Sequence, residues 1–458
     1  MLICQLPRAL RSVSRASASS PLRTFTSSSL LAREAAIEPE NVTRIERVMR
    51  LGDQLGRSSK HSVAPLRLRG SGAFSAKPHV VAPKRLEAQL PTKRRMEDSY
   101  VSMDLLFSSN AALREQYIGG LAKVRMGRLM EDFDALAGTA AYRHVLPDGT
   151  TPADAASYGL YIVTAAVDRM DMLRPLTNSS GEVPDLRLSG HVSYTTESSL
   201  EVFLRLSTIP TGEEPAETIL LGRFAMACRA STGGKQKIAQ LDVVGPEEEE
   251  LWQMGKEMRE GKKSRSQKSL EKTPPNEKEA KLMHDLFVGK AEIFKRNAPT
   301  PSDVVWMSDT NVNSALLMHP QERNVHNKVF GGYLMRLAYE TAYSTACLFA
   351  QTPVTFLALD ELRFALPVEI GSLLTLDSRV TFSPIVGEHK SFHVAVEAGS
   401  RNLATGEKHV TNTFHFTFSS DKPLARHVLP RSYKQAMQWL DAQRRREQGI
   451  LVRKDYDT

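Results

Sequence analysis

The sequence predicts an α+β protein made of two tandem repeats, each an antiparallel sheet wrapped around one central helix. The first observation is that one order of elements, a strand, one helix and then a run of strands, occurs twice. The second is internal similarity: residues 127–137 resemble residues 332–342, and residues 167–172 resemble residues 359–364. The third is that no helices separate the later strands, which argues against a parallel β-α-β sheet.

The first repeat is expected to begin with a strand near Tyr100, followed by a helix at Met126–His144. The segment from Pro147 to Tyr158 is rich in turn residues. Three strand-like runs come next, at Leu160–Met172, Leu186–Ile209 and Ile219–Arg229.

The second repeat is expected to begin after Pro301. A strand at Val304–Asp309 leads through a loop to a helix at about Gly332–Ala350. Four strands follow, at Val354–Phe364, Leu373–Phe382, Phe392–Glu397 and His409–Phe418. Beyond Asp421 the chain is basic, and a further helix is expected around Tyr433–Arg446.

Residue spacing predicts which faces are buried. The second helix carries a stripe at intervals of three and four residues, formed by Leu334, Leu337, Thr341, Thr345 and Leu348. In the strand that ends at Phe418, alternation predicts that four residues face this helix: Val410, Phe414, Phe416 and Phe418. His415 and Thr417 should then face outward.

Composition divides the chain into six segments. Residues 1–33 contain five arginines, many serines and no acidic residue, which is typical of a mitochondrial transit peptide, the alternative being an unstructured tail. Residues 34–96 are expected to be a poorly ordered extension, 97–246 the first domain and 247–300 a charged linker or an exposed helix followed by a linker. Residues 301–425 are the second domain, and 426–458 a basic helix or tail.

Overall composition excludes several classes of function. The chain has 458 residues, 41% of them hydrophobic and 24% charged, as in ordinary globular proteins, and no apolar run is long enough to span a membrane. The net charge of +8 comes without a zinc-ligand spacing or an RNA-binding signature, so we expect no nucleic-acid partner. Three widely spaced cysteines support neither a disulfide framework nor a metal site.

The segment that leads into the second helix carries the main motif, Asn324-Val-His-Asn-Lys-Val-Phe-Gly-Gly-Tyr-Leu-Met. Glycines at a helix start let the backbone approach a ligand closely, and the free amides there can stabilise negative charge. By itself, the pair Gly331 and Gly332 could equally form a tight turn. The motif resembles the signature of hotdog-fold acyl-CoA thioesterases, and the whole layout is similar to mitochondrial members with two hotdog domains in one chain.

The resemblance implies a composite active site. In that family an acidic residue in the hotdog helix acts as general base or nucleophile opposite an asparagine from the partner domain. The acidic position falls on Asp134 in the first repeat, and the asparagine on Asn324 in the second. In the second repeat the acidic position falls on Tyr339, with Glu340 one residue later as a candidate for a second site. Asp134 could also be a solvated helical acid.

The resemblance also implies the substrate and its contacts. Asp134 would activate water or attack the thioester carbonyl, Asn324 would orient water or substrate, and amides near Gly331 and Gly332 would stabilise the oxyanion. Lys328 and Arg336 are candidates for binding coenzyme A phosphates. No metal or separate cofactor is expected, because coenzyme A is part of the substrate.

The predicted function is therefore hydrolysis of acyl-CoA to a free acid and coenzyme A in the mitochondrion, most simply in the matrix. Two alternatives remain: a hotdog dehydratase, and an acyl-CoA-binding or scaffold protein with a degenerate site. A serine hydrolase is disfavoured because no Gly-x-Ser-x-Gly motif occurs. The two domains are expected to pair within the chain, and such pairs could assemble further into a homo-oligomer.

Overall fold

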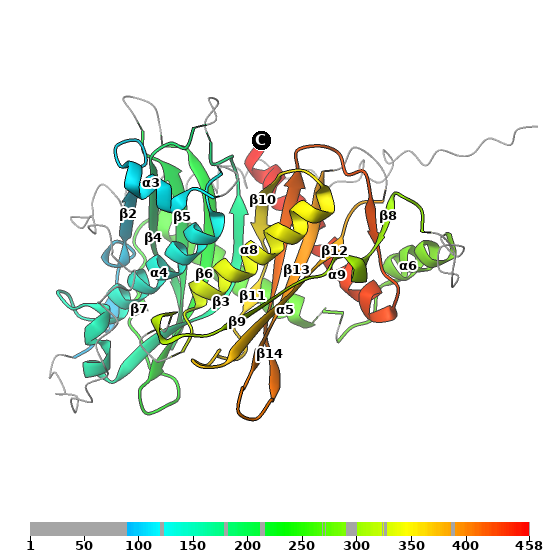
Figure 1. The fold of residues 1–458 in the computed structure, drawn as a ribbon. Coiled ribbons are helices and arrows are strands. Elements are labelled where there is room, and N and C mark those ends of the chain that lie inside the picture. The colour runs from blue at the N-terminus through cyan, green and yellow to red at the C-terminus, as the bar shows by residue number, and fades with distance from the viewer. Residues whose placement is uncertain are drawn as a thin grey trace, which may run out of the picture.

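The computed structural model describes residues 89–119, 123–177, 182–210, 216–267, 269–270, 272–289, 300–322, 324, 328–385 and 390–457. The predicted transit peptide and most of the predicted extension lie outside these residues. In the described chain, two long helices, α4 and α8, lie across one face of a continuous sheet (Figure 1). This is the predicted α+β architecture of two tandem hotdog repeats.

The first repeat contains most of the predicted elements at nearly the predicted positions. After the two-residue strand β1 (Lys93–Arg94), its elements are β2 (Val101–Leu105), α3 (Ala111–Tyr117), α4 (Met126–Val145), β3 (Leu160–Met172), β4 (Leu186–Thr195), β5 (Ser199–Thr208), β6 (Thr218–Ala230), β7 (Gln240–Leu241) and α5 (Pro246–Gln267). The single run predicted at Leu186–Ile209 is thus a hairpin of two strands.

The second repeat repeats this order. Its elements are α6 (Glu277–Gly289), β8 (Val304–Trp306), β9 (Val312–Leu317), α8 (Gly331–Ala350), β10 (Val354–Leu359), β11 (Leu362–Arg363), β12 (Leu373–Phe382), β13 (Ser391–Arg401), β14 (Lys408–Ser420), β15 (His427–Leu429) and α9 (Tyr433–Asp457). Short 3-10 helices occur at Glu97–Ser99, Pro152–Tyr158, Met307–Thr310 and Pro320–Glu322. The predicted strand at Val304–Asp309 is therefore only three residues long and gives way to a 3-10 turn.

The sheets of the two repeats join edge to edge. The strand order is β2-β4-β5-β6-β3-β10-β14-β13-β12-β9, with β11 also paired to β3. The joint is the antiparallel pair of β3 with β10, in which Asp171 lies opposite Ala358 and Met170 opposite Leu359. Because hydrogen bonds cross this joint, neither repeat leaves an open edge where the two meet.

The core lies between the sheet and the two helices. Phe414, Phe416 and Phe418 are fully buried, as alternation predicted. Val410 is 50% exposed, so its predicted inward direction is wrong. The reason is a register irregularity between Ala398 and Gly399 on the partner strand, which shifts the inside-outside phase of β14 before Phe414.

The predicted stripe on α8 is only partly right. Leu334, Thr341 and Thr345 are buried, but Leu348 is 65% exposed. At about 100° per residue, the buried face of α8 is centred on Ala338, Ala342 and Ala346. The predicted stripe runs along one edge of this face, and Leu348 lies just outside that edge.

The convex face of the sheet is covered by a helix at the end of each repeat. Trp252 of α5 packs against Tyr194, with ring centroids 5.6 Å apart, and Trp439 of α9 packs against Phe382 at 4.8 Å. Leu251 of α5 is 2% exposed. The first helix of the predicted linker 247–300 therefore packs against the first repeat. Thr417 and His415, which were expected to face away from α8, both contact the ring of the buried His393.

Among the described residues, no helix combines the length and the apolar composition that a membrane crossing requires.

Candidate functional site

Asp134 lies near the middle of α4, where this helix meets the start of α8. Its side chain is 2% exposed. Oδ2 accepts a hydrogen bond from the backbone N–H of Gly332 at 2.7 Å, and Oδ1 accepts one from the Thr164 hydroxyl at 2.6 Å. The structure therefore brings together the predicted acid of the first repeat and the predicted glycine segment of the second.

The close approach of the two helices depends on glycine. A Cβ on Gly332 would lie 2.7 Å from Cε1 of Phe330 and 3.0 Å from both Asp134 Cβ and Glu131 Cα. Real Cβ atoms do not come so close to other heavy atoms, so any larger residue would push α8 away from α4. The first amides of a helix have no partner within the helix, which leaves the Gly332 N–H free to bind the carboxylate.

Burial raises the pKa of Asp134 from about 3.8 to about 6. Desolvation is the main cause, and the negative charge of Glu131 acts in the same direction. The hydrogen bonds from Thr164 and Gly332 oppose it. A carboxyl group with this pKa is ionised at neutral pH yet is a stronger base than an exposed aspartate, which suits proton abstraction.

Thr164 was not predicted from the sequence. It lies in the middle of β3, and a threonine in a strand carries no motif of its own. The only available signal was the internal similarity, in which β3 aligns with β10 and Thr164 aligns with Phe356. A hydroxyl residue in one repeat aligned with an aromatic residue in the other marks a position where the two repeats differ in chemistry.

Asn324 lies in the loop that enters α8. Its N–H donates to the carbonyl oxygen of Lys328 at 2.7 Å, and its side-chain Oδ1 accepts from the Lys328 N–H at 3.1 Å. The N–H of Phe330 donates to the carbonyl oxygen of Glu322 at 3.0 Å, which closes the loop directly before Gly331. The predicted meeting of Asn324 with Asp134 stays a prediction.

The loop that enters α4 has the same hydrogen-bond pattern. The N–H of Gly119 donates to the carbonyl oxygen of Lys123 at 2.8 Å, and that of Arg125 donates to the carbonyl oxygen of Tyr117 at 2.7 Å. Matching the two loops bond for bond sets Gly119 in the place of Asn324. The first repeat thus keeps the loop but lacks the amide side chain.

The related position in the second repeat is aromatic. Tyr339 takes the place of Asp134, and its Cδ1 would lie 3.3 Å from a Cβ on Gly127, the counterpart of Gly332. The rings of Tyr339 and Phe356 meet edge to face with centroids 5.7 Å apart, where Asp134 and Thr164 share a hydrogen bond in the other half. The two halves have the same backbone arrangement, but this contact is polar in the first half and aromatic in the second.

Glu340 does not take the place of the missing acid. Its Oε1 accepts from Arg125 Nη2 at 2.6 Å, and both side chains are about 40% exposed. One residue along a helix turns the side chain by about 100°, which moves Glu340 off the face that meets Gly127. In this structure Glu340 makes an ion pair between the two repeats.

The two predicted phosphate-binding cations each have an acidic neighbour. Lys328 pairs with Glu369. Arg336 Nη1 donates to Glu131 Oε2 at 3.0 Å, and its guanidinium lies 4.9 Å from the centre of the Tyr333 ring. Arg336 thus links α8 to α4 beside Asp134, and a role for either cation in binding phosphate stays a prediction.

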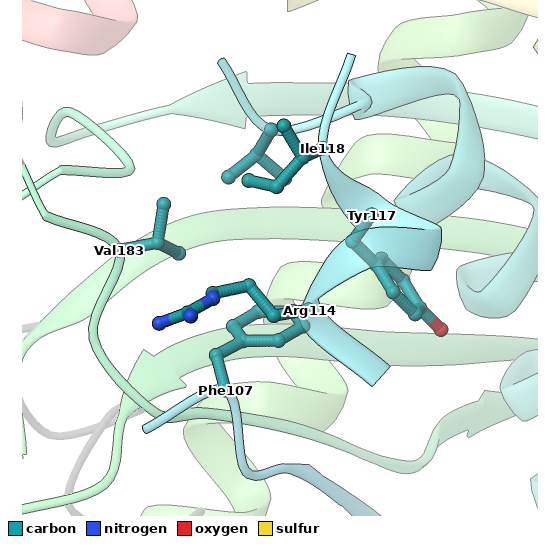
Figure 2. A pocket seen from close by; sticks show the side chains of 6 residues that line it. Phe107, Arg114, Tyr117, Ile118 and Val183 are labelled. Carbon is teal, nitrogen blue, oxygen red and sulfur yellow. The ribbon is translucent and has the colours of Figure 1, made fainter. Parts of the chain in front are cut away.

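A shallow hollow with no room for an enclosed ligand lies beside Tyr117. Figure 2 shows the side chains that line it: Phe107, Arg114, Tyr117, Ile118, Val124 and Val183. None of the predicted site residues lines this hollow. It is too small to be a site for acyl-CoA.

Comparison with known proteins identifies relatives of the whole chain. Human mitochondrial acyl-coenzyme A thioesterase 9 is 36% identical over 371 residues, which cover 79% of this chain and 81% of the human protein. Mouse mitochondrial acyl-coenzyme A thioesterase 10 is 33% identical over 82% of this chain and 84% of its own length. No protein-family model matches the chain.

Solved structures give a more distant likeness. Acyl-CoA hydrolase from Staphylococcus aureus, solved with butyryl coenzyme A and coenzyme A, is 21% identical with a TM-score of 0.31. The match covers 34% of this chain and 94% of that protein.

Proposed function

Because the chain belongs to the family of mitochondrial acyl-coenzyme A thioesterases, we propose that it hydrolyses acyl-CoA at one composite site per chain. The observation that carries this proposal is the buried carboxyl group of Asp134, held by the hydroxyl of Thr164 from its own repeat and by the N–H of Gly332 from the other. A general base and backbone N–H groups at a helix N-terminus are groups that can assist thioester hydrolysis.

In the proposed reaction Asp134 takes a proton from a water molecule, and the hydroxide adds to the thioester carbon. The tetrahedral oxyanion collapses and expels the coenzyme A thiolate, which receives the proton. The free acid and the thiol leave. Because Asp134 is only 2% exposed, substrate entry has to part the side chains that cover it. The Gly332 N–H donates to Asp134 Oδ2, so it can bind the carbonyl oxygen, where charge develops, only by exchanging that hydrogen bond.

Direct attack by Asp134 on the thioester carbon is the alternative route, with an anhydride as the intermediate. A single turnover in water enriched in heavy oxygen separates the two routes. Label incorporated into the Asp134 carboxyl group supports the anhydride. Label found only in the released acid fits activation of water and also attack of water on the acyl carbon of the anhydride, so trapping of an acyl group on Asp134 then decides between the two routes.

We propose that the other half of the chain is not catalytic. Each polar group of the first site has an apolar or smaller counterpart there: Tyr339 for Asp134, Phe356 for Thr164 and Gly119 for Asn324. A tyrosine whose pKa is raised by burial, as that of Tyr339 is, remains neutral and supplies no base.

The primary test measures free thiol released from acyl-CoA by the purified protein. The Asp134→Asn variant should lose roughly a hundredfold to ten-thousandfold in turnover. Asp285→Asn, which changes an exposed carboxylate on α6, should leave the rate unchanged and serves as the matched control. Tight acyl-CoA binding without thiol release would instead favour a binding protein, and a new double bond in the acyl chain would favour a dehydratase.

We propose that the protein works in the mitochondrion, most simply in the matrix, after removal of an N-terminal presequence. The acid-free, arginine-rich segment 1–33 and the mitochondrial names of the relatives support this. N-terminal sequencing of the protein recovered from isolated mitochondria tests it. A higher homo-oligomer remains an expectation, and light scattering of the purified protein tests it.

A further inference from the structure

A short apolar segment is exposed to solvent next to Asp134. Residues 364–367, with the sequence Phe-Ala-Leu-Pro, directly follow β11. Phe364 is half-buried, Ala365 and Pro367 are exposed, and the Leu366 side chain is 46% exposed. These residues form a small apolar surface directly beside the polar group of the proposed site.

The first residue of this segment touches the proposed site. A Cβ on Gly331 would lie 3.2 Å from Cζ of Phe364 and equally 3.2 Å from Oδ2 of Asp134. The Phe364 ring and the Asp134 carboxylate therefore flank the same glycine. A thioester carbon held at Asp134 would lie within a few bond lengths of this ring.

Both ends of the segment are anchored to parts of the site. The N–H of Phe364 donates to the carbonyl oxygen of Ala165 at 3.1 Å, one residue after Thr164. The carbonyl oxygen of Val368 accepts from the N–H of Val329 at 3.0 Å, in the strand-like end of the Asn324 loop. The 364–367 segment thus runs from β3, whose Thr164 binds Asp134, to the loop that enters α8.

We propose that the 364–367 segment is the surface on which the hydrocarbon chain of the acyl group packs. Phe364 lies next to the carbonyl carbon, and Leu366 contacts carbons farther along the chain. This inference rests on the proposed thioesterase function and adds to it the residues that select among acyl groups. Hydrocarbon that covers exposed apolar side chains is removed from water along with them, which favours binding.

The pantetheine arm of coenzyme A fits this segment less well. Its two amide groups need hydrogen-bond partners when they leave water. The Phe364 N–H and the Val368 carbonyl oxygen, at the two ends of the segment, already bind Ala165 and Val329. The side chains between them offer only carbon atoms, so pantetheine amides could pair only with the backbone groups of the segment, whereas a hydrocarbon chain needs no such partner.

The test compares turnover on acetyl-, butyryl-, octanoyl- and dodecanoyl-CoA for the wild type and for Leu366→Ser. Because Leu366 is largely exposed, its replacement should leave the fold intact. The ratio of kcat/KM for dodecanoyl-CoA to that for acetyl-CoA should fall roughly tenfold, mainly through KM, as expected when a few methylene groups lose an apolar contact. Acetyl-CoA should be hydrolysed at the wild-type rate.

Leu403→Ser is the matched control, because Leu403 is another exposed leucine, 59% exposed, in the turn between β13 and β14. It should not change the ratio. An equal loss for all four substrates would assign the segment to the coenzyme A portion and overturn the proposal. A ratio unchanged in Leu366→Ser would overturn it as well.

A second measurement separates this inference from the proposed function. Calorimetric affinities for dodecanoyl-CoA are compared between Asp134→Asn and Asp134→Asn combined with Leu366→Ser. Weaker binding by the double variant, with unchanged binding of free coenzyme A, supports the acyl surface even if the wild type releases no thiol. Absence of thiol release from every substrate contradicts the proposed function alone.

Discussion

The carboxyl group of Asp134 is kept in an environment that favours its neutral form. Since burial raises its pKa to about 6, the folded protein holds this proton more tightly than the unfolded chain, where the pKa is near 3.8. The contribution of Asp134 to stability is therefore greatest below pH 4 and is lost as the pH rises through about 6. At neutral pH the ionised carboxylate destabilises the fold.

Asp134→Asn should consequently be more stable than the wild type at neutral pH. A shift of about two pKa units sets an upper limit of roughly 3 kcal/mol, and we expect about 1–2 kcal/mol because the amide cannot keep both hydrogen bonds. Urea denaturation at several pH values measures this. The gain should shrink between pH 6 and pH 4, and a variant that is less stable at neutral pH would refute the argument.

Thr164 is expected to position and tune this carboxylate. Thr164→Val keeps the shape but removes the hydroxyl donor, so the pKa of Asp134 should rise further, and kcat/KM at neutral pH should fall roughly tenfold. The acid limb of the pH–rate profile should move to higher pH, an effect that a packing defect would not produce. Thr164→Ser, which keeps the hydroxyl, should retain most of the activity and the original limb.

At the scale of elements, the helices α4 and α8 present the same backbone with different side chains. Tyr339 packs among Phe356, Phe416 and Phe418, with ring centroids 5.7 to 6.0 Å away. Its ring fills the space where the first site holds a carboxylate. In the second repeat the helix contact therefore contributes to packing alone.

Tyr339→Phe should leave kcat and KM unchanged, because the hydroxyl has no part in turnover. Tyr339→Ala should lower the free energy of unfolding by about 3–5 kcal/mol through the cavity it creates, while the activity per folded molecule stays the same. Thiol-release kinetics and chemical denaturation measure both. A large loss of turnover in Tyr339→Phe would show that the second half takes part in the chemistry.

Elements with strong periodicity were predicted closely. Strand β12 has the predicted bounds, and α8 begins one residue earlier than predicted. Both were predicted closely because their apolar residues recur at the spacing expected for a strand and for a helix. Val410 and Leu348 were assigned to the wrong face for a different reason. A β-bulge changed the phase of the alternation in β14, and the local sequence does not mark it. The stripe predicted on α8 followed only one edge of the buried face, because the centre of that face is made of the small residues Ala338, Ala342 and Ala346.

The site was predicted only where the chain offers a motif. Gly331 and Gly332 belong to a recognisable segment, and counting from its internal match at Gly127 located Asp134. Thr164 could not be found in this way, because its contact with Asp134 depends on how β3 passes beneath α4. The equivalence of Gly119 and Asn324 follows from the offset of 205 residues that also relates Gly127 to Gly332, although the residues around them differ, and the hydrogen bonds of the two loops have the same spacing.

At the scale of the whole molecule, a buried ionic cluster lies where the repeats join. Arg169 Nε donates to Asp171 Oδ2 at 2.7 Å, and its Nη1 donates to Asp360 Oδ1 at 2.6 Å. All three side chains are at most 12% exposed. One guanidinium thus ties strand β3 of the first repeat to the end of β10 in the second.

Arg169→Met should lower the free energy of unfolding by about 3–5 kcal/mol, because two buried carboxylates lose the cation between them. The melting transition should stay single, since the sheet is continuous across the joint. Arg363→Met is the control. The pair of Glu361 and Arg363 aligns with the pair of Arg169 and Asp171 in the first repeat, but Arg363 is half exposed, so the loss of stability should be at most about 1 kcal/mol. Two separate calorimetric peaks in the wild type would contradict a single cooperative unit.

Joining the two repeats in one chain also changes what a mutation can do. In a dimer of identical subunits, each substitution appears twice, so a residue that improves packing on one side also removes chemistry on the other. A covalent tandem breaks this constraint, because position 339 can become an aromatic anchor while position 134 remains an acid. In the fused chain one half can therefore be optimised for stability and the other for catalysis, which a dimer of identical subunits does not allow.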